Sequence, residues 1–426
     1  MTDRRTKQAE PKRRGRSAAE FDLVVFGATS FVGQILCRYL ASRTGAGRVG
    51  SWAIAGRSEG KLQALRSSLG AAGAKLPMIV ADASDEPSLR DLCARTRVVI
   101  STVGPYALYG EPLVKVCAAS GTDYCDLTGE VQWVARMLER HEAAARESGA
   151  RIVHCCGFDS IPSDLGVLFL QQQAIERFGQ PCVQVSMRVK AMRGGASGGT
   201  IASMLNIVEE AARDPALRRS LANPYWLCPP GTGDGVRQTS LKGPAWDPDF
   251  DAWTAPFVMA VINTRVVLRS DALAGHPYGA GFRYDEALLT GRGLPGRLAA
   301  LGVTAGMGGF ALGAALAPTR AVMQRFVLPG PGTGPSPAAQ QKGFFDLRFL
   351  GRTADGRTLR TKVTGDRDPG YGSTGKMLGE AGACLAMDVG KADLAGGFWT
   401  PATAMGKPLL ARLQAHAGVG FEVLAR

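Results

Sequence analysis

The sequence predicts an α/β protein with a doubly wound parallel sheet in its N-terminal part and a second, α+β domain after it. Short apolar runs alternate with helical patterns from Phe21 to Gly157, which is typical of a parallel sheet with helices on both faces. After Gly157 apolar and polar residues alternate, as they do in half-exposed strands. The chain of 426 residues is too long for one ordinary core.

Six strands and five intervening helices are expected in the N-terminal part. Each strand is a short apolar run, and each helix places apolar residues three and four positions apart. Ser58 suits the N-cap of the second helix, and Gly70 suits its C-terminal stop. The strands are expected at 21–27, 51–57, 76–82, 97–104, 122–129 and 151–157, and the helices at 31–43, 58–70, 86–96, 110–121 and 131–149.

The C-terminal part is expected to mix strands and helices. Alternation predicts a strand at 183–194, and helical spacing predicts a helix at 200–214. A hairpin is expected at 344–366, with its turn at Asp355–Gly356. The stretch 223–256 is rich in Pro, Gly and Trp, so we expect it to be irregular.

Charge and pattern together give the domain boundaries. The net charge is +13, and basic residues outnumber acidic ones in an N-terminal segment without apolar periodicity. We therefore expect a disordered basic tail at 1–19 and an α/β domain at 20–157. An α+β domain for substrate binding or dimerisation is expected at 158–426, and its C-terminal helices could pack back on the first domain.

Composition argues against several classes of protein. Hydrophobic content of 45% and charged content of 20% are normal for a folded soluble chain. The tail lacks the apolar segment of a secretory signal, and the nine cysteines are scattered without a CxxC pair, which indicates reduced thiols in the cytoplasm. None of the four histidines has a metal-ligand partner at helical spacing, so no metal site is expected. We expect the tail to be solvated, with no nucleic-acid partner.

The stretch 298–319 contains no charged residue and approaches the length of a membrane span. Three interpretations stay open. We favour a buried or substrate-facing helix over peripheral contact with a membrane, and both over a true span, because the Gly/Ala-rich composition is weakly hydrophobic. The protein is therefore expected in the cytoplasm, free or peripheral to the membrane, and a homodimer is left open.

The run GATSFVG, from Gly27 to Gly33, links the first expected strand to the first helix. Gly27 allows a sharp turn, and Gly33 allows the helix to pack close to the strand. After Thr29, the free amides of the helix that begins near Phe31 would face a phosphate. Ser30 stands where a middle glycine is common, and its hydroxyl could donate to a phosphate oxygen. This context predicts a Rossmann-type dinucleotide site.

The end of the second strand favours NADP over NAD. An NAD site usually has an acidic residue there, whereas this strand ends in Arg57 and Ser58, with Lys61 one turn into the helix. A guanidinium fork and a hydroxyl suit a 2′-phosphate. Asp82 is expected near the adenine. Three residues after the fourth strand are expected beneath the nicotinamide ribose: Val103, Gly104 and Pro105.

The runs GATSFVG, AGRS, STVGPYALYG, DLTGE and GFDSIPSDLG, in this order, resemble the saccharopine dehydrogenase-like oxidoreductases. With DPGYGSTGKMLGEAGACLA and GGFWTPATAMG near the C-terminus, the chain is most similar to the branch of trans-acting enoyl reductases. The resemblance covers most of the chain from about Phe21. It implies an NADP-linked reductase with a Rossmann domain and an α+β domain, acting on the enoyl double bond of a polyketide-type acyl chain supplied in trans. Ser30 departs from the family's common glycine.

Candidate proton donors follow the fourth to sixth strands, because a hydride transfer to an enoyl carbon must be completed by a proton. Tyr106 and Tyr109 are expected near the nicotinamide, with simple packing as the alternative. Asp159 and Ser160 could orient a substrate, or Asp159 and Asp164 could cap the next helix. The other candidates are Tyr124, Asp126 and His154, of which the histidine is expected to belong to the core.

Two other functions stay open. A reductase of an imine or amino-acid substrate would need cations for substrate carboxylates, which Arg188, Lys190 and Arg193 could supply. A non-catalytic NADP-binding protein, attached to a membrane through 298–319, is the second alternative.

Overall fold

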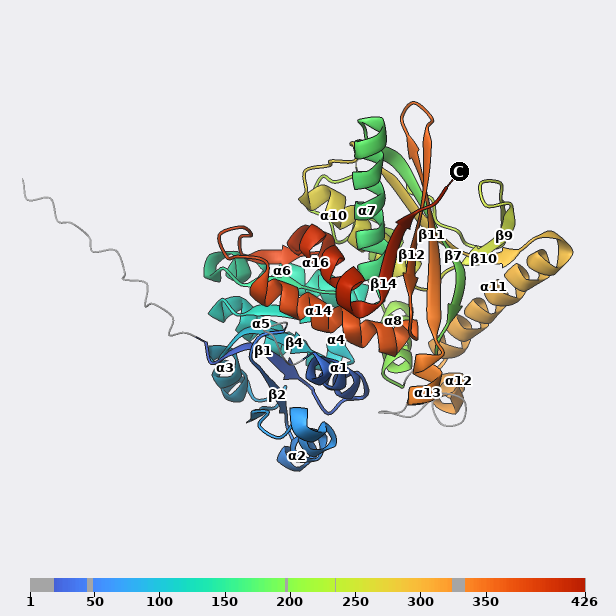
Figure 1. Cartoon of the computed structure of the whole chain (residues 1–426). Coiled ribbons are helices and arrows are strands. Elements are labelled where there is room, and N and C mark those ends of the chain that lie inside the picture. The colour runs from blue at the N-terminus through green and yellow to red at the C-terminus, as the bar shows by residue number, and fades with distance from the viewer. Residues whose placement is uncertain (1–18, 44–48, 196–197, 234, 324–333, 426) are drawn as a thin grey trace, which may run out of the picture.

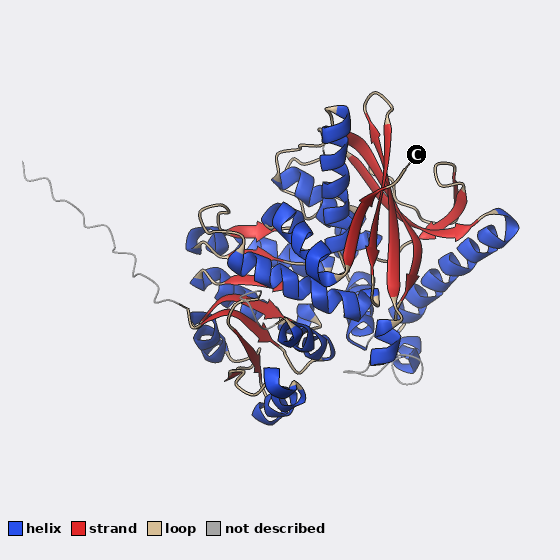
Figure 2. Cartoon of the chain, in the orientation of Figure 1, coloured by secondary structure: helices blue, strands red, loops and turns tan. Residues whose placement is uncertain are grey.

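Two seven-stranded sheets dominate the computed structural model, which describes residues 19–43, 49–195, 198–233, 235–323 and 334–425. Figure 1 shows them in two lobes: sheet A, formed mainly by N-terminal strands, and sheet B, formed by C-terminal strands. Helices surround sheet A, whereas the long strands of sheet B extend away from it (Figure 2).

Sheet A is parallel, with strand order β13-β6-β5-β4-β1-β2-β3. The order reverses between β1 and β4, where doubly wound sheets bind ligands outside the carboxyl ends of their strands. The predicted Rossmann-type sheet is therefore confirmed. Its strands are β1 (Phe21–Phe26), β2 (Trp52–Gly56), β3 (Met78–Val80), β4 (Thr96–Ser101), β5 (Asp123–Asp126), β6 (Arg151–Val153) and β13 (Gly397–Trp399).

The helices between these strands lie close to their expected positions. Ser58 caps the second helix, because its side chain accepts a hydrogen bond from the Lys61 amide. Six helices belong to this part: α1 (Phe31–Ser42), α2 (Glu59–Ser68), α3 (Glu86–Ala94), α4 (Tyr106–Tyr109), α5 (Glu111–Ser120) and α6 (Val131–Ser148).

Two C-terminal elements complete sheet A. Strand β13 pairs with β6, and helix α14 (Thr374–Met387) packs on α1 and β4. Glycines permit this approach: a Cβ on Gly382 would lie 2.4 Å from Ile100, and one on Gly379 would lie 3.0 Å from Tyr39. The expected range 20–157 thus does not hold the whole sheet.

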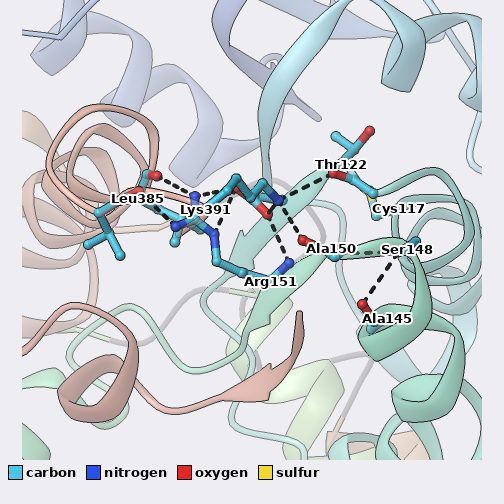
Figure 3. Close-up of polar contacts among 12 residues, drawn as sticks. Cys117, Thr122, Ala145, Ser148, Ala150, Arg151, Leu385 and Lys391 are labelled. Atoms are coloured by element: carbon cyan, nitrogen blue, oxygen red, sulfur yellow. Dashed lines mark hydrogen bonds and ion pairs between the residues drawn. The ribbon is translucent and has the colours of Figure 1, made fainter. Parts of the chain in front are cut away.

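A buried ion pair ties the C-terminal end of α14 to the amino ends of β5 and β6 (Figure 3). Nε and Nη2 of Arg151 donate to Oδ2 of Asp123 at 3.1 and 2.5 Å. The same guanidinium donates to the backbone oxygens of Leu385 and Val389, at 2.9 and 2.7 Å. Lys391 donates to the other oxygen of Asp123. This network lies at the amino ends of the strands, opposite to the turn between β1 and α1, so it stabilises the fold and leaves the carboxyl ends of the strands free.

Sheet B is mixed, with strand order β14-β12-β11-β7-β10-β9-β8. The expected hairpin is confirmed: β11 and β12 pair antiparallel, and Gly356 in their turn has a φ of 86°. The irregular structure expected at 223–256 is partly wrong, because β8 and β9 pair there. The strands are β7 (Cys182–Arg193), β8 (Ala245–Asp247), β9 (Ala252–Pro256), β10 (Arg283–Gly291), β11 (Phe344–Thr353), β12 (Thr358–Gly365) and β14 (Val419–Val423).

Helix α7 (Ile161–Phe178) covers one face of sheet B through its contacts with β11 and β12. The expected helix at 200–214 is confirmed as α8 (Gly198–Arg213), which contacts α11. The remaining helices are α9 (Pro215–Ala222), α10 (Ala260–Leu273), α13 (Pro337–Gln341), α15 (Pro401–Ala404) and α16 (Gly406–Arg412), with π-helical turns η3 (Pro369–Ser373) and η4 (Leu413–Ala417).

Helix α11 (Gly293–Ala315) corrects the interpretation of 298–319 as a buried helix. It packs against β9, β10 and α8, yet most of its residues remain exposed. Its length and composition alone would suffice to cross a membrane, and no other helix in the described ranges meets that test. The helix ends at Ala315, and Leu316 is the N-cap of the short α12 (Ala317–Val322).

Candidate active site

The turn between β1 and α1 has no room for side chains at its two glycines. Gly27 has a φ of +81°, and a Cβ there would lie 2.7 Å from Cγ2 of Val103. A Cβ on Gly33 would lie 2.3 Å from the backbone oxygen of Gly27. The first turn of α1 therefore lies directly against the strand end, and its free amides face outward at the carboxyl edge of sheet A. This cradle fits the pyrophosphate of a dinucleotide.

The hydroxyl of Ser30 stabilises this turn itself. It accepts a hydrogen bond from the Gly33 amide at 2.9 Å, as an N-cap does, and lies 3.0 Å from the Thr102 hydroxyl. Thr102 in turn donates to the backbone oxygen of Gly27 at 2.9 Å. The serine thus replaces a flexible glycine with a side chain that joins the turn to the end of β4. The sequence indicated the position of Ser30 but not its partner Thr102.

The first residues of α1 also contact the segment η3, which precedes α14. The Phe31 ring packs edge-on against Tyr371 in η3, with ring centroids 5.2 Å apart. Thr29 precedes it, and its backbone oxygen accepts a hydrogen bond from Gln34 at 3.2 Å. The start of α1 is therefore held in place by η3, which leads into α14.

The end of β2 presents a cation at the surface. Arg57 is exposed, and no acidic residue stands at the end of this strand. The Ser58 hydroxyl caps helix α2, because it accepts a hydrogen bond from the backbone amide of Lys61 at 3.4 Å. The pKa of Asp82 lies below its usual value because Ser84 donates two hydrogen bonds to the carboxylate and Arg57 adds positive charge. The arrangement leaves the Arg57 guanidinium accessible to an anionic group.

The loop after β4 is held by Glu130, which the sequence analysis did not select. The Glu130 carboxylate accepts hydrogen bonds from the backbone amides of Tyr106 and Ala107, at 2.8 and 3.0 Å. It also accepts one from the Ser203 hydroxyl of α8 at 2.8 Å. These contacts fix Val103, Gly104 and Pro105 beside the turn at Gly27. In the sequence, Glu130 was marked only as the last residue of the run DLTGE, one of the runs that resemble the saccharopine dehydrogenase-like family.

The two tyrosines proposed as donors lie in different surroundings. The Tyr106 hydroxyl is buried, donates to the Ser101 backbone oxygen at 3.0 Å and accepts from the Leu127 amide at 3.4 Å. Burial raises the pKa of Tyr106 well above its usual value. Its hydroxyl is therefore engaged by the backbone of the sheet, and Tyr106 is not placed to donate a proton to a substrate. Tyr109 lies at the end of α4 and is half exposed.

Asp159 has the properties that a proton donor needs. Its carboxylate lies between two glycine backbones: a Cβ on Gly129 would meet Oδ1 at 3.3 Å, and one on Gly157 would meet Oδ2 at 2.9 Å. Burial of the carboxyl group and the nearby charge of Asp126 raise the pKa of Asp159 to about 7. The residue nevertheless keeps some contact with solvent. It can therefore carry a proton near neutral pH and exchange it.

Ser160, expected to contact a substrate, instead begins a buried polar chain. Its hydroxyl donates to the side-chain oxygen of Asn263 at 3.1 Å, and Asn263 donates to Glu286 at 3.0 Å. The hydroxyl of Tyr284 donates to the other oxygen of Glu286 at 2.7 Å. The Asp164 carboxylate likewise accepts hydrogen bonds from the Ser270 hydroxyl and from the backbone amide of Ala402. These groups join α7 to α10 and α15 rather than face a substrate.

The other donor candidates form hydrogen bonds with one another, although Nε2 of His154 is buried without a partner among the described residues. Oδ2 of Asp126 accepts hydrogen bonds from the Tyr124 hydroxyl at 3.0 Å and from Nδ1 of His154 at 2.7 Å. His154 is buried, and its ring packs edge-on against Trp133 with centroids 4.9 Å apart. The expectation of a core histidine is consistent with this position.

Arg188, expected to bind substrate, is already paired. Its guanidinium donates to Asp247 at 2.6 Å and to Asp285 at 2.5 Å, and their charges raise its pKa. Lys190 lies 3.9 Å from Asp346, and Arg193 is exposed at the end of β7. The two carboxylates outweigh the single charge of Arg188, so the cluster offers no excess positive charge to an anionic substrate.

Helix α8 spans the two lobes over the carboxyl edge of sheet A. Its Thr200 hydroxyl lies 2.9 Å from that of Tyr371, its Ser203 reaches Glu130, and its Glu210 pairs with Arg136 at 3.3 Å. Figure 1 shows α8 between sheet B and the Rossmann lobe. Through Glu130, the helix thus reaches the loops that follow β4 and β5.

Residues 23–153 match the family model of the saccharopine dehydrogenase NADP binding domain. Trans-acting enoyl reductases of Mycobacterium ulcerans and Mycobacterium tuberculosis are 38% and 39% identical to the chain, each over 92% of this chain and 96% of the relative. The chain belongs to the family of trans-acting enoyl reductases. This membership makes it an NADP-dependent oxidoreductase of the saccharopine dehydrogenase-like type, as the resemblance implied.

A further relative in Mycobacterium tuberculosis, whose name assigns it the same activity provisionally, is 42% identical over 95% of this chain and 97% of its own. Among solved structures, the apo saccharopine dehydrogenase (L-Glu forming) of Saccharomyces cerevisiae covers 95% of the chain with a TM-score of 0.52 and 16% identity. That likeness concerns the fold: both lobes of this trans-acting enoyl reductase family member follow the saccharopine dehydrogenase arrangement.

Proposed function

We propose that the protein reduces the carbon–carbon double bond of an enoyl acyl substrate with NADPH. The glycine cradle at Gly27 and Gly33 and the first turn of α1 would hold the pyrophosphate. Arg57 would pair with the 2′-phosphate, and the loop at Val103 to Pro105 would lie under the nicotinamide ribose. NADPH, when bound, supplies the hydride.

Asp159 would complete the reduction with a proton. Addition of hydride to the β-carbon of an enoyl group leaves negative charge that is delocalised over the α-carbon and the carbonyl oxygen, and a proton must reach the α-carbon. A carboxyl group with a pKa of about 7 is partly protonated at neutral pH and can donate there. The enclosed position of Asp159 between Gly129 and Gly157 is the observation that carries this assignment.

The choice of an acyl over an amino-acid substrate rests on two supports. The relatives are named for enoyl reduction. In addition, Asp247 and Asp285 together outweigh the charge of Arg188, whereas a saccharopine-type substrate would need free cations for its carboxylates. We therefore do not favour the imine or amino-acid alternative.

A paired turnover assay tests the proposal. Purified protein is given NADPH with crotonyl-N-acetylcysteamine thioester, and in parallel NADPH with lysine and 2-oxoglutarate. We expect oxidation of NADPH only with the thioester, and a saturated acyl product by mass spectrometry. Turnover with the amino-acid pair and none with the thioester would reverse the assignment. Failure to bind NADPH, measured by nicotinamide fluorescence, would remove it altogether.

A further inference from the structure

The outward face of α11 is an uninterrupted apolar stripe. Leu294, Leu298, Leu301 and Leu312 are exposed to 66%, 58%, 47% and 66%. At 3.6 residues per turn, these four positions fall within an arc of about 60° and extend along about 27 Å of helix. A surface helix of a soluble protein normally places polar residues on this face. The stripe therefore needs an explanation that packing within the chain does not supply.

The opposite face of α11 is the one that packs on the protein. Gly296, Ala300 and Ala314 are buried, and the helix contacts β9, β10 and α8. These small residues bring the helix close to sheet B, while the leucines point away from it. In Figure 1, α11 lies along the outer edge of the molecule beside β9 and β10. Because its inner face is already occupied, α11 cannot cross a bilayer without leaving sheet B, but it can lie along one.

Charge and aromatic residues border the stripe at its N-terminal end. The Arg297 guanidinium lies over the Trp253 ring, 5.3 Å from its centroid, and Trp246 nearby is 43% exposed. Residues 298–319 carry no charge. Arginine and tryptophan at the end of an apolar surface are typical of proteins that rest at the headgroup level of a membrane. The net charge of +13 adds long-range attraction to an anionic surface.

We propose that the leucine stripe of α11, formed by Leu294, Leu298, Leu301 and Leu312, docks the protein on an anionic phospholipid surface as an interfacial helix. The leucines enter the acyl region, and Arg297 and the two tryptophans meet the headgroups. This inference is independent of the proposed reaction. The stripe would place helix α8, which contacts α11, close to the bilayer.

Vesicle co-sedimentation of the full chain tests the inference. The vesicles contain either phosphatidylglycerol mixed with phosphatidylcholine or phosphatidylcholine alone. We expect binding to the anionic vesicles and much weaker binding to the neutral ones. Leu298→Glu and Leu312→Glu should each lower the partition coefficient about tenfold or more, because each loses a buried leucine and adds a repelled charge. Ile175→Glu on α7, where the isoleucine is 47% exposed, is the matched control and should bind like the parent protein.

Three outcomes would overturn the inference. Equal binding by the parent protein and the leucine variants would assign the attraction to other basic surfaces. No binding to either vesicle, together with a dimer in sedimentation velocity that Leu298→Glu disrupts, would make the stripe a contact with a second copy. An equal loss in Ile175→Glu would show a general effect of added negative charge. Circular dichroism and thermal unfolding of all variants confirm that the exposed substitutions leave the fold intact.

Discussion

The Ser203 hydroxyl of α8 donates a hydrogen bond to the Glu130 carboxylate at 2.8 Å. The same carboxylate receives the backbone amides of Tyr106 and Ala107, which open helix α4. One buried side chain therefore joins helix α8 to the loop expected beneath the nicotinamide. Burial raises the pKa of Glu130 even though these donors oppose the shift.

Removal of the Ser203–Glu130 hydrogen bond should destabilise the protein, and Glu130→Ala should do so more than Ser203→Ala. Ser203→Ala removes one hydrogen bond, so we expect a loss of about 1 kcal/mol in the free energy of unfolding and faster amide exchange in α8. Glu130→Ala leaves two backbone amides without an acceptor, and we expect a loss of about 2 kcal/mol or more. Urea unfolding of both single variants and of the double variant measures the coupling. Strictly additive losses would contradict a direct Ser203–Glu130 contact.

Arg57 should set the preference between the two nicotinamide cofactors. Loss of a charge-assisted pair with the 2′-phosphate in Arg57→Ala is expected to weaken NADPH binding about 10- to 100-fold and to change NADH binding little. Titrations followed by nicotinamide fluorescence measure both affinities. Arg66→Ala, which removes a partly buried arginine on the adjacent helix α2, serves as the control. An equal loss of affinity for NADPH and NADH would mean that Arg57 does not bind the 2′-phosphate.

Asp159 should make turnover depend on pH in a defined direction. If its protonated form donates, kcat falls as the pH rises through about 7, the pKa of Asp159 in the folded protein. Asp159→Asn keeps the shape but cannot donate, so we expect kcat to fall about 10²- to 10⁴-fold with NADPH affinity retained, and the pH dependence to flatten. Tyr109→Phe, which lies on a half-exposed helix end, should leave the profile unchanged. If Tyr109→Phe lost its activity while Asp159→Asn stayed active, Tyr109 and not Asp159 would be the proton donor.

Local patterns were sufficient to predict the first six strands of sheet A and the turn at Gly27, because each is a continuous segment with its own periodicity. The seventh strand, β13, was not predicted, because a segment of three residues is too short to show an alternation of apolar and polar residues. It becomes a strand through its pairing with β6. The function of side chains was harder to predict than their positions. Whether Tyr106 faces a cofactor or the interior depends on Ser101 and Leu127, and whether Arg188 is free depends on Asp247 and Asp285. Such partners are set by tertiary contacts between distant segments.

The buried carboxyl group of Glu286 should make stability depend on pH. It accepts hydrogen bonds from Tyr284 and Asn263, but burial dominates and raises its pKa to about 7 from an ordinary value near 4.5. The folded protein thus holds a proton that the unfolded chain releases. The stabilising contribution is fully present below about pH 4.5 and is lost as the pH rises through about 7.

Glu286→Gln removes this titration, because an amide has the shape of the protonated acid and no charge. We therefore expect the variant to gain stability relative to the parent protein as the pH is raised from 4.5 to 8, in urea unfolding followed by circular dichroism. Asp159 and Asp164, whose pKa values burial also raises to about 7, remain in both proteins and cancel in the difference. A difference that stays constant over this range would mean that Glu286 keeps its charge in the folded state, held by Tyr284 and Asn263.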